Sequence, residues 1–311
     1  MAHPLIRRTL LGALLLVFGI APSLATGEDR LAVLPDGRRL HLSCSGSGSP
    51  TILLESGLGL PMISWSKVKT QLEPDLRVCS YERAGYGTSD PGPLPRDARH
   101  VADDLAELLR AEKIAGPYVL VGHSLGSHYV RLFAAEHPTD VLGLVLVDPI
   151  FEDNDRKLAL ASPEVKAFLE EEKATLERCV GAVARGQLWT IGEAGYERCG
   201  PPPPPGSAMA KPEMAQATLS EFASRERSAG QVRAATRRRL NPPLIVLTAV
   251  GRRSPQLSGA QDVTMREHAA IAATSVRGVH RQVEDSGHVI HFDRPDAVAQ
   301  AVKDIVTSSR R

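Results

Sequence analysis

The sequence predicts an α/β fold, in which a mostly parallel sheet is flanked by helices and carries an inserted helical cap. Short apolar runs of strand length alternate with longer segments of helical period up to about residue 150, and the strand signal resumes near residue 243. These runs lack alternation with polar residues, as expected for strands whose two faces are both covered by helices. The length of 311 residues suits one large domain with an insertion.

Most of the expected strands lie in the first half of the chain. Two short β-forming runs on either side of the Pro35–Gly37 turn predict a hairpin over residues 31–44. Continuous apolar runs predict further strands, and segments with apolar residues on one helical face predict the helices between them. These strands are expected at residues 51–55, 76–81, 118–122 and 141–147, and the helices at residues 97–112 and 125–137.

The rhythm breaks at residue 151, and the chain is helical or irregular up to residue 240. Ser162-Pro163 is a typical helix start, and the Pro201–Pro205 run indicates a stiff extended link. We interpret the arginines of residues 225–239 as a solvated helix face balanced by nearby glutamates. The sheet is completed by strands expected at 243–248 and 281–284, and a final helix is expected at 295–309. We therefore predict a main domain made of residues 26–150 and 241–311, with a cap over residues 151–240.

The first 25 residues have the pattern of an export signal. Arg7 and Arg8 precede an apolar run over residues 9–20, and Ser23 and Ala25 are the small residues that a signal peptidase recognises. We expect cleavage, which would leave 35 of the 37 basic residues against 36 acidic ones, and export to the periplasm or the medium. The alternative is an uncleaved anchor, although the run is short beside the roughly 20 residues of a membrane span.

Charge and cysteine content limit the classes of partner. A net charge of +1 lacks the basic excess of a nucleic-acid surface, and no stable membrane association is expected after signal cleavage. In an oxidising compartment, an even number of cysteines predicts disulfides, and the residues alone leave three pairings open. The spacing of the four cysteines does not suggest a metal site. They are Cys44, Cys79, Cys179 and Cys199.

The strongest chemical signal is the motif Gly122-His123-Ser124-Leu125-Gly126. It falls between a predicted strand and a predicted helix, which is the context of a nucleophile elbow. The glycines allow a sharp turn that raises the Ser124 hydroxyl above the sheet edge. The helix that follows directs its N-terminal amides at the point where negative charge would develop.

With this motif, the chain resembles a capped, lipase- or esterase-like member of the α/β-hydrolase family. The similarity covers about residues 30–150 and 241–308, and it includes Glu55–Gly59, Arg83–Asp90 and Ser286–His288. The resemblance implies a serine hydrolase that cleaves a small-molecule carboxylic ester and needs no metal or organic cofactor. Haloalkane or epoxide hydrolysis is not expected, because those reactions need a carboxylate at the nucleophile position.

The resemblance also points to the base and the acid. A serine needs a base within hydrogen-bond reach, and the family position after the last strand selects His288 over His291. The family acid usually follows the strand at residues 244–248, where this chain has no carboxylate. Some relatives place it one strand earlier, so we predict Asp148, which would orient the base. The alternatives are Asp262 and Glu152.

Two further expectations follow from the family fold. The oxyanion hole should use the backbone N–H groups of Leu125, directly after the nucleophile, and of Leu58. In the family strand order, the strand ending at Cys44 lies beside the strand carrying Cys79, within disulfide reach. The expected disulfides are therefore Cys44–Cys79 in the sheet and Cys179–Cys199 in the cap.

Two other functions remain open from the sequence. An amide hydrolase similar to proline iminopeptidases would bind a free amine through acidic cap residues, and the cap is rich in glutamate. A catalytically inactive binding module on the same fold would explain the missing carboxylate after residues 244–248.

Overall fold

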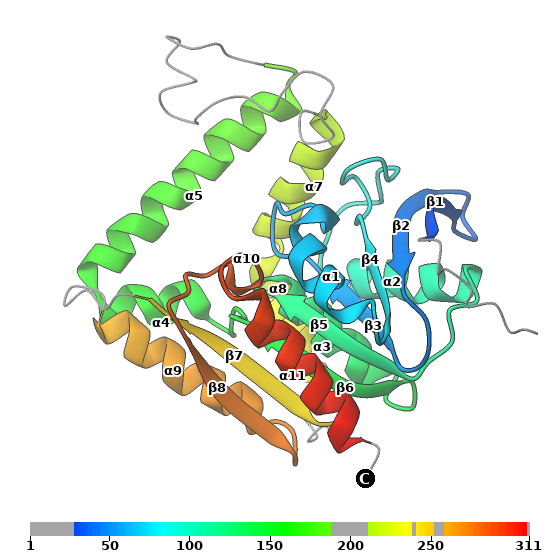
Figure 1. The fold of residues 1–311 in the computed structure, drawn as a ribbon. Coiled ribbons are helices and arrows are strands. Elements are labelled where there is room, and N and C mark those ends of the chain that lie inside the picture. Colours follow the sequence, from blue (N-terminus) through cyan, green and yellow to red (C-terminus); the bar gives the residue numbers. More distant parts are fainter. Residues whose placement is uncertain (1–27, 188–210, 238–240, 252–257, 310–311) are drawn as a thin grey trace, which may run out of the picture.

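The computed structural model describes residues 28–187, 211–237, 241–251 and 258–309 (Figure 1). Within this part of the chain, eight strands form one sheet in the order β1-β2-β4-β3-β5-β6-β7-β8. β2 is antiparallel to both of its neighbours, and every pair from β4 to β8 is parallel. The predicted, mostly parallel α/β sheet is confirmed. The strands are β1 (Glu28–Val33), β2 (Arg39–Ser45), β3 (Thr51–Glu55), β4 (Arg77–Tyr81), β5 (Tyr118–His123), β6 (Val141–Val147), β7 (Leu244–Val250) and β8 (Gly278–Glu284).

Helices cover both faces of this sheet (Figure 1). Alternate residues of β5 belong to two separate hydrophobic cores, with Val119 and Val121 in one and Leu120 in the other. Each inner strand is therefore apolar on both faces, which explains its continuous apolar run. One face is covered by α1 (Ser66–Leu72) and α11 (Pro295–Ser308), and the other by α2 (Ala98–Ala111), α3 (Gly126–Glu136) and α9 (Ser258–Ala272).

Several elements were absent from the sequence prediction. Besides α1 and α9, they are the 3₁₀ helix η1 (Met62–Trp65) and the single turn α10 (Ile290–Asp293). The last strand also begins three residues earlier than predicted, at Gly278. These segments lack a strong apolar period of their own and acquire their structure by packing against the sheet layers.

The N-terminal hairpin is linked to the parallel part of the sheet by a disulfide. Cys44 on β2 lies directly opposite Cys79 on β4 in the antiparallel register, with 4.1 Å between their Cα atoms. The predicted Cys44–Cys79 disulfide is confirmed. Cys199 lies outside the described residues, so the Cys179–Cys199 pair stays a prediction.

The cap segment (residues 151–240) connects β6 to β7 and is helical where it is described. Its second helix extends away from the sheet, and the C-terminal part of that helix contacts the start of the third (Figure 1). The side chain of Ser162 accepts the N–H of Val165 at 3.2 Å, as expected for a helix start there. The predicted Pro201–Pro205 link lies outside the described residues. The cap helices are α4 (Asn154–Ala161), α5 (Pro163–Ala184), α7 (Pro212–Ala223) and α8 (Arg225–Ala235).

Charge pairing in the cap segment differs from the prediction. The arginines of α8 are balanced by aspartates of other elements rather than by nearby glutamates. Arg225 pairs with Asp155 at 2.8 Å, and Arg233 pairs with Asp153 at 3.6 Å. Because both aspartates lie at the start of α4, these pairs join two cap helices that the sequence does not place side by side.

No helix in the described part of the chain is long and apolar enough to cross a membrane. The predicted signal, residues 1–25, lies outside the described residues.

Candidate active site

Ser124 lies at a sharp turn between β5 and α3. Its backbone φ is +50°, a left-handed conformation that a non-glycine residue adopts only under constraint. The flanking glycines allow the close packing. A Cβ on Gly122 would lie 2.6 Å from Cγ2 of Val130, and one on Gly126 would lie 2.5 Å from the carbonyl oxygen of Ser56. The motif therefore has glycine where any other side chain would displace the serine.

The structure brings the three predicted side chains into one hydrogen-bonded row. Nε2 of His288, in the loop after β8, is 2.9 Å from Oγ of Ser124. Nδ1 of His288 is 2.7 Å from Oδ2 of Asp148, the residue directly after β6. The other carboxylate oxygen of Asp148 accepts the N–H of Ala249 at 3.0 Å. This is the order of contacts that serine, histidine and aspartate need for proton transfer.

The pairing of β6 with the adjacent strand β7 fixes the position of Asp148. Its backbone N–H donates to the carbonyl of Leu247 at 2.8 Å, so the end of β6 is fixed against β7. Its φ of +42° turns the side chain out of the strand direction. The alternative acids are placed differently. Glu152 pairs with Arg131 at 3.0 Å, and Asp262 is exposed on α9.

Buried histidines surround His288. The ring of His123 lies 4.8 Å from that of His288, and its Nε2 is 3.0 Å from the His288 carbonyl oxygen. Burial lowers the pKa of His123 well below its usual value, and it lowers the pKa of His291 to about 4. His291 also stacks on Trp65 with 4.2 Å between ring centroids. At neutral pH these rings carry no charge, so they do not repel an imidazolium that forms on His288.

The turn after β3 lies against the elbow. A Cβ on Gly57 would lie 2.6 Å from Nδ1 of His123 and 3.3 Å from Cβ of Ser124, so this turn needs glycine for its close approach. Leu58 follows in the turn, and Leu125 follows the serine. Both leucines line the same cavity as Ser124. Among the hydrogen bonds of the described residues, none is donated by the backbone N–H of either leucine to a protein acceptor.

A cavity of about 630 Å³ lies over the serine, between the strand ends and the cap segment. Most of its wall is apolar, and residues of α4, α5, α7 and α8 form part of it. Among the described residues, no three His, Cys, Asp or Glu side chains are grouped so that they could hold a metal ion. The apolar lining includes Leu60, Ile150, Phe151, Leu158, Leu176 and Phe222.

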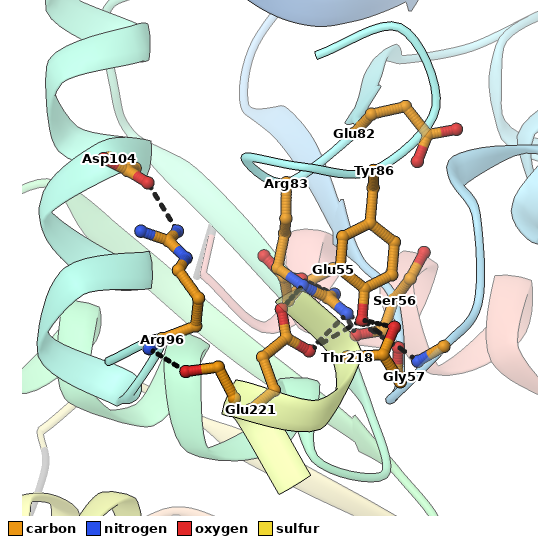
Figure 2. A network of polar contacts seen from close by, with 12 residues as sticks. Glu55, Ser56, Gly57, Glu82, Arg83, Tyr86, Arg96, Asp104, Thr218 and Glu221 are labelled. Atoms are coloured by element: carbon orange, nitrogen blue, oxygen red, sulfur yellow. Dashed lines mark hydrogen bonds and ion pairs between the residues drawn. The ribbon is translucent and has the colours of Figure 1, made fainter. Parts of the chain in front are cut away.

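A buried charged network beside the site was not identified from the sequence. The sequence places Arg83 only in a loop of the family pattern, and Glu221 is one of many cap glutamates. Figure 2 shows their side chains in direct contact, and the two carboxylate oxygens of Glu221 are 2.8 and 3.0 Å from nitrogens of Arg83. The sequence did hold one signal, because Glu221 follows Met214 and Ala217 at helical spacing on an otherwise apolar face.

Comparison with known proteins agrees with this architecture. Residues 52–301 match the model of the Alpha/beta hydrolase family. The uncharacterized protein YqjL of Bacillus subtilis is 26% identical over 273 residues, which cover 87% of this chain and 89% of that protein. A fluoroacetate dehalogenase of Burkholderia sp is 31% identical over 166 residues, 50% of this chain and 53% of that protein. A solved thermophilic esterase from Thermogutta terrifontis is similar with a TM-score of 0.58 and 22% identity, covering 92% of this chain and 100% of that one. The chain therefore belongs to the alpha/beta hydrolase family.

Proposed function

We propose that this hydrolase cleaves carboxylic esters through a covalent acyl-enzyme on Ser124. The observation that carries the proposal is the continuous row of hydrogen bonds from Ser124 through His288 to Asp148. Oγ of Ser124 would attack the ester carbonyl carbon while Nε2 of His288 takes its proton. The carboxylate of Asp148, at Nδ1, would hold the ring in the required tautomer and stabilise the imidazolium.

The tetrahedral intermediate then carries a negative oxygen, which we assign to the N–H groups of Leu58 and Leu125. When this intermediate collapses, the bond to the alcohol oxygen breaks and His288 returns the proton to that oxygen. A water molecule next attacks the acyl carbon, and His288 takes a proton from it. The second intermediate releases the carboxylic acid and restores the Ser124 hydroxyl with that proton.

The identity of the nucleophile favours acyl transfer over reactions at saturated carbon. Attack by Ser124 on an alkyl halide or an epoxide would form an ether, which water activated by a histidine does not cleave. A carboxylate nucleophile would form an ester, which can be hydrolysed. This argument separates the chain from the dehalogenation after which its Burkholderia relative is named, although 31% identity links the two sequences.

The cavity wall favours an apolar ester over a substrate with a free amine. Asp153 and Asp155 line the cavity from the start of α4, and each pairs with an arginine of α8, whereas Glu226 of α8 lines the cavity and is exposed to solvent. A carboxylate that is paired or screened by water offers less attraction to an ammonium group. We therefore place the amide hydrolase of the proline-iminopeptidase kind second, and comparison of an aryl ester with an aminoacyl anilide tests this order.

The decisive experiment is the substitution Ser124→Ala. We expect it to lower aryl-ester hydrolysis by roughly 10⁴-fold or more and to abolish labelling by a fluorophosphonate probe. Ser127→Ala is the matched control, because Ser127 is also buried and lies in the first turn of α3. Labelling that persists in Ser124→Ala would contradict the proposal. A wild-type protein that is neither labelled nor active would identify the inactive binding module instead.

We also propose that the protein is exported. The signal pattern of residues 1–25 supports this, and so does the Cys44–Cys79 disulfide, because such bonds persist in oxidising compartments. The expected result is a mature protein that begins directly after Ala25 and is found outside the cytoplasm. Intact-mass measurement on fractionated cells tests this, and an uncleaved chain in the membrane fraction would instead indicate the anchor.

A further inference from the structure

We propose that Arg83 and Glu221 are positioning residues that orient the backbone N–H of Leu58. The oxyanion hole then forms only when the cap helix α7 is packed in place. This inference rests on the proposed function of Ser124. It is carried by the buried contacts between the loop after β4, the turn after β3 and α7.

The first step concerns the peptide between Gly57 and Leu58. Nη2 of Arg83 donates to the carbonyl oxygen of Gly57 at 2.9 Å, and Nη1 donates to that of Ser56 at 2.8 Å. The peptide after Gly57 is planar and trans, so its C=O and its N–H point in opposite directions. Fixing the carbonyl oxygen on Arg83 therefore directs the N–H of Leu58 away from Arg83. Leu58 lines the cavity over the serine, and Arg83 does not.

A positive charge on the carbonyl side also improves the donor on the other side. Hydrogen bonds in series polarise one another, and the effect is larger in a medium of low dielectric constant. The side chain of Arg83 is 2% exposed, so its charge acts with little screening by water. The guanidinium is thus placed to strengthen as well as to orient the N–H of Leu58.

The second step concerns what fixes Arg83. A guanidinium has five N–H donors, and here all five have acceptors. Two donors bind the turn carbonyls, one binds Glu55 at 2.6 Å, and two form a fork with Glu221 at 2.8 and 3.0 Å. The rings of Tyr86 and Tyr129 flank the group, with centroids 4.4 and 5.5 Å from its Cζ atom. Lysine could not reproduce this geometry, because its ammonium has three donors and no fork.

The third step links the network to the cap. Glu221 is fully buried on α7, and Figure 2 shows it reaching Arg83 from that helix. A second route runs through the hydroxyl of Tyr86, which donates to Glu221 at 2.9 Å and accepts the N–H of Gly59 at 3.2 Å. Thr218 of α7 donates to the same hydroxyl at 3.1 Å. α7 is therefore linked to both ends of the turn that holds Leu58, through Arg83 at Gly57 and through Tyr86 at Gly59.

A neighbouring ion pair offers a matched control. Arg96 is 1% exposed and pairs with Asp104 (Figure 2). Its backbone N–H donates to Oγ of Ser220 on α7 at 2.8 Å. The guanidinium of Arg96 makes no hydrogen bond to the turn among the described residues. Asp104→Asn therefore weakens a buried pair near α7 without touching the carbonyl oxygens that position Leu58.

The experiment compares Glu221→Gln with Asp104→Asn in the full chain. We expect Glu221→Gln to lower kcat for an aryl ester by roughly 10- to 100-fold with KM changed by less than about 3-fold, because a misdirected donor weakens the transition state more than the ground state. Affinity for phenylboronic acid, which forms a tetrahedral adduct on a serine oxygen, should fall by a similar factor. Asp104→Asn should lower Tm and keep kcat within about 2-fold.

Two results would overturn the inference. One is an unchanged kcat in Glu221→Gln, and the other is an equal loss of kcat and of boronic-acid affinity in Asp104→Asn. If Glu221→Gln does not fold, Tyr86→Phe serves instead, since it removes only the hydroxyl that contacts Gly59 and Glu221, and we expect a loss in kcat of roughly 3- to 10-fold.

A measurement independent of turnover separates this inference from the proposed function. Deuterium exchange of the amides in residues 56–60 should be faster by roughly 10-fold in Glu221→Gln and unchanged in Asp104→Asn. Absence of ester turnover in the wild-type protein would contradict the proposed function alone. Equal exchange in the wild type and in Glu221→Gln would contradict the positioning role alone.

Discussion

On one side of Ser124, His288 and Asp148 lie in loops after two strands, and the side chain of His288 is 53% exposed. On the other side, the turn of Gly57 and Leu58 is held by Arg83, whose side chain is 2% exposed and whose donors are all bonded. In the proposed reaction His288 is the base, which must exchange protons with a leaving alcohol and with water and so has to stay accessible. The proposed oxyanion hole works by being oriented in advance, so its supports can be buried.

The two sides also differ in how they treat charge. Around His288, burial keeps the neighbouring His123 and His291 neutral, and in the proposed reaction His288 becomes charged when it takes the Ser124 proton. Around Arg83, the buried guanidinium charge is paired with Glu55 and Glu221 within the protein. In the proposed reaction, charge therefore develops at His288 on the base side of Ser124. On the oxyanion side, the electrostatic field of Arg83 is present before the reaction begins.

The largest effect is expected on the base side, for Asp148→Asn. The amide can leave His288 in the wrong tautomer for accepting the Ser124 proton, so kcat should fall by roughly 10³- to 10⁴-fold with KM nearly unchanged. Asp262→Asn is the control, because Asp262 was the alternative acid and is exposed on α9. Steady-state kinetics of both variants on one aryl ester decide this. A larger loss in Asp262→Asn would exchange the two assignments.

A second prediction separates global stability from both sides of the site. The double variant Cys44→Ala/Cys79→Ala opens a loop with a sequence separation of 35, which by chain entropy should cost about 4 kcal/mol in free energy of unfolding. Denaturant titration would measure this loss. Below the transition, kcat should stay within about 2-fold of the wild type, since the disulfide touches neither His288 nor the oxyanion turn. A large loss of kcat in the folded variant would show that the sheet edge and the site are coupled.

The oxyanion side is tested by Gly57→Ala. The added Cβ would meet His123 and Ser124, so the turn must shift and kcat should fall by roughly 10- to 100-fold. Gly230→Ala on α8 is the matched control, because a Cβ there meets nothing within 4 Å. It should keep kcat and stabilise the fold by about 0.5–1 kcal/mol through helix propensity. Equal activity of the two variants would contradict the close packing of turn and elbow.

The last prediction concerns the pH dependence of stability, which has opposite sign on the two sides. The folded pKa of His291 is lowered to about 4 by burial, so its stabilising contribution is present above the unfolded value of about 6.5 and is lost as pH falls from there toward 4. Burial raises the pKa of Glu55, so its contribution is present below the unfolded value and is lost as pH rises through the folded value.

Urea unfolding between pH 4 and pH 7 separates these two contributions. His291→Phe keeps a ring against Trp65 and should reduce the rise in stability between pH 4 and 6.5 by roughly 1 kcal/mol per pH unit. Glu55→Gln should make the net rise steeper, because the opposing contribution is removed. If the free energy of unfolding changes with pH equally in both variants and in the wild type, His291 and Glu55 have the same pKa in the folded and unfolded states, and the prediction is wrong.

Much of the sheet and of the elbow could be predicted from the sequence because the signals are local. A parallel strand covered on both faces must be apolar at every position, and β5 and β6 show this as continuous runs. The turn at Ser124 needs its two flanking glycines within a few residues. The position of Asp148 was predicted through the family resemblance, because some relatives place the acid one strand earlier and no carboxylate follows residues 244–248.

Only the tertiary structure decided which residues hold the turn of Gly57 and Leu58. Glu221 and Arg83 are far apart in the chain, and nothing local indicates that α7 brings one onto the other. The partners of the α8 arginines and the position of α9 likewise depend on which helices pack together. The physical reason is that apolar period and turn chemistry are encoded within one element. Compensation of a buried charge depends on the partner that another element presents to it.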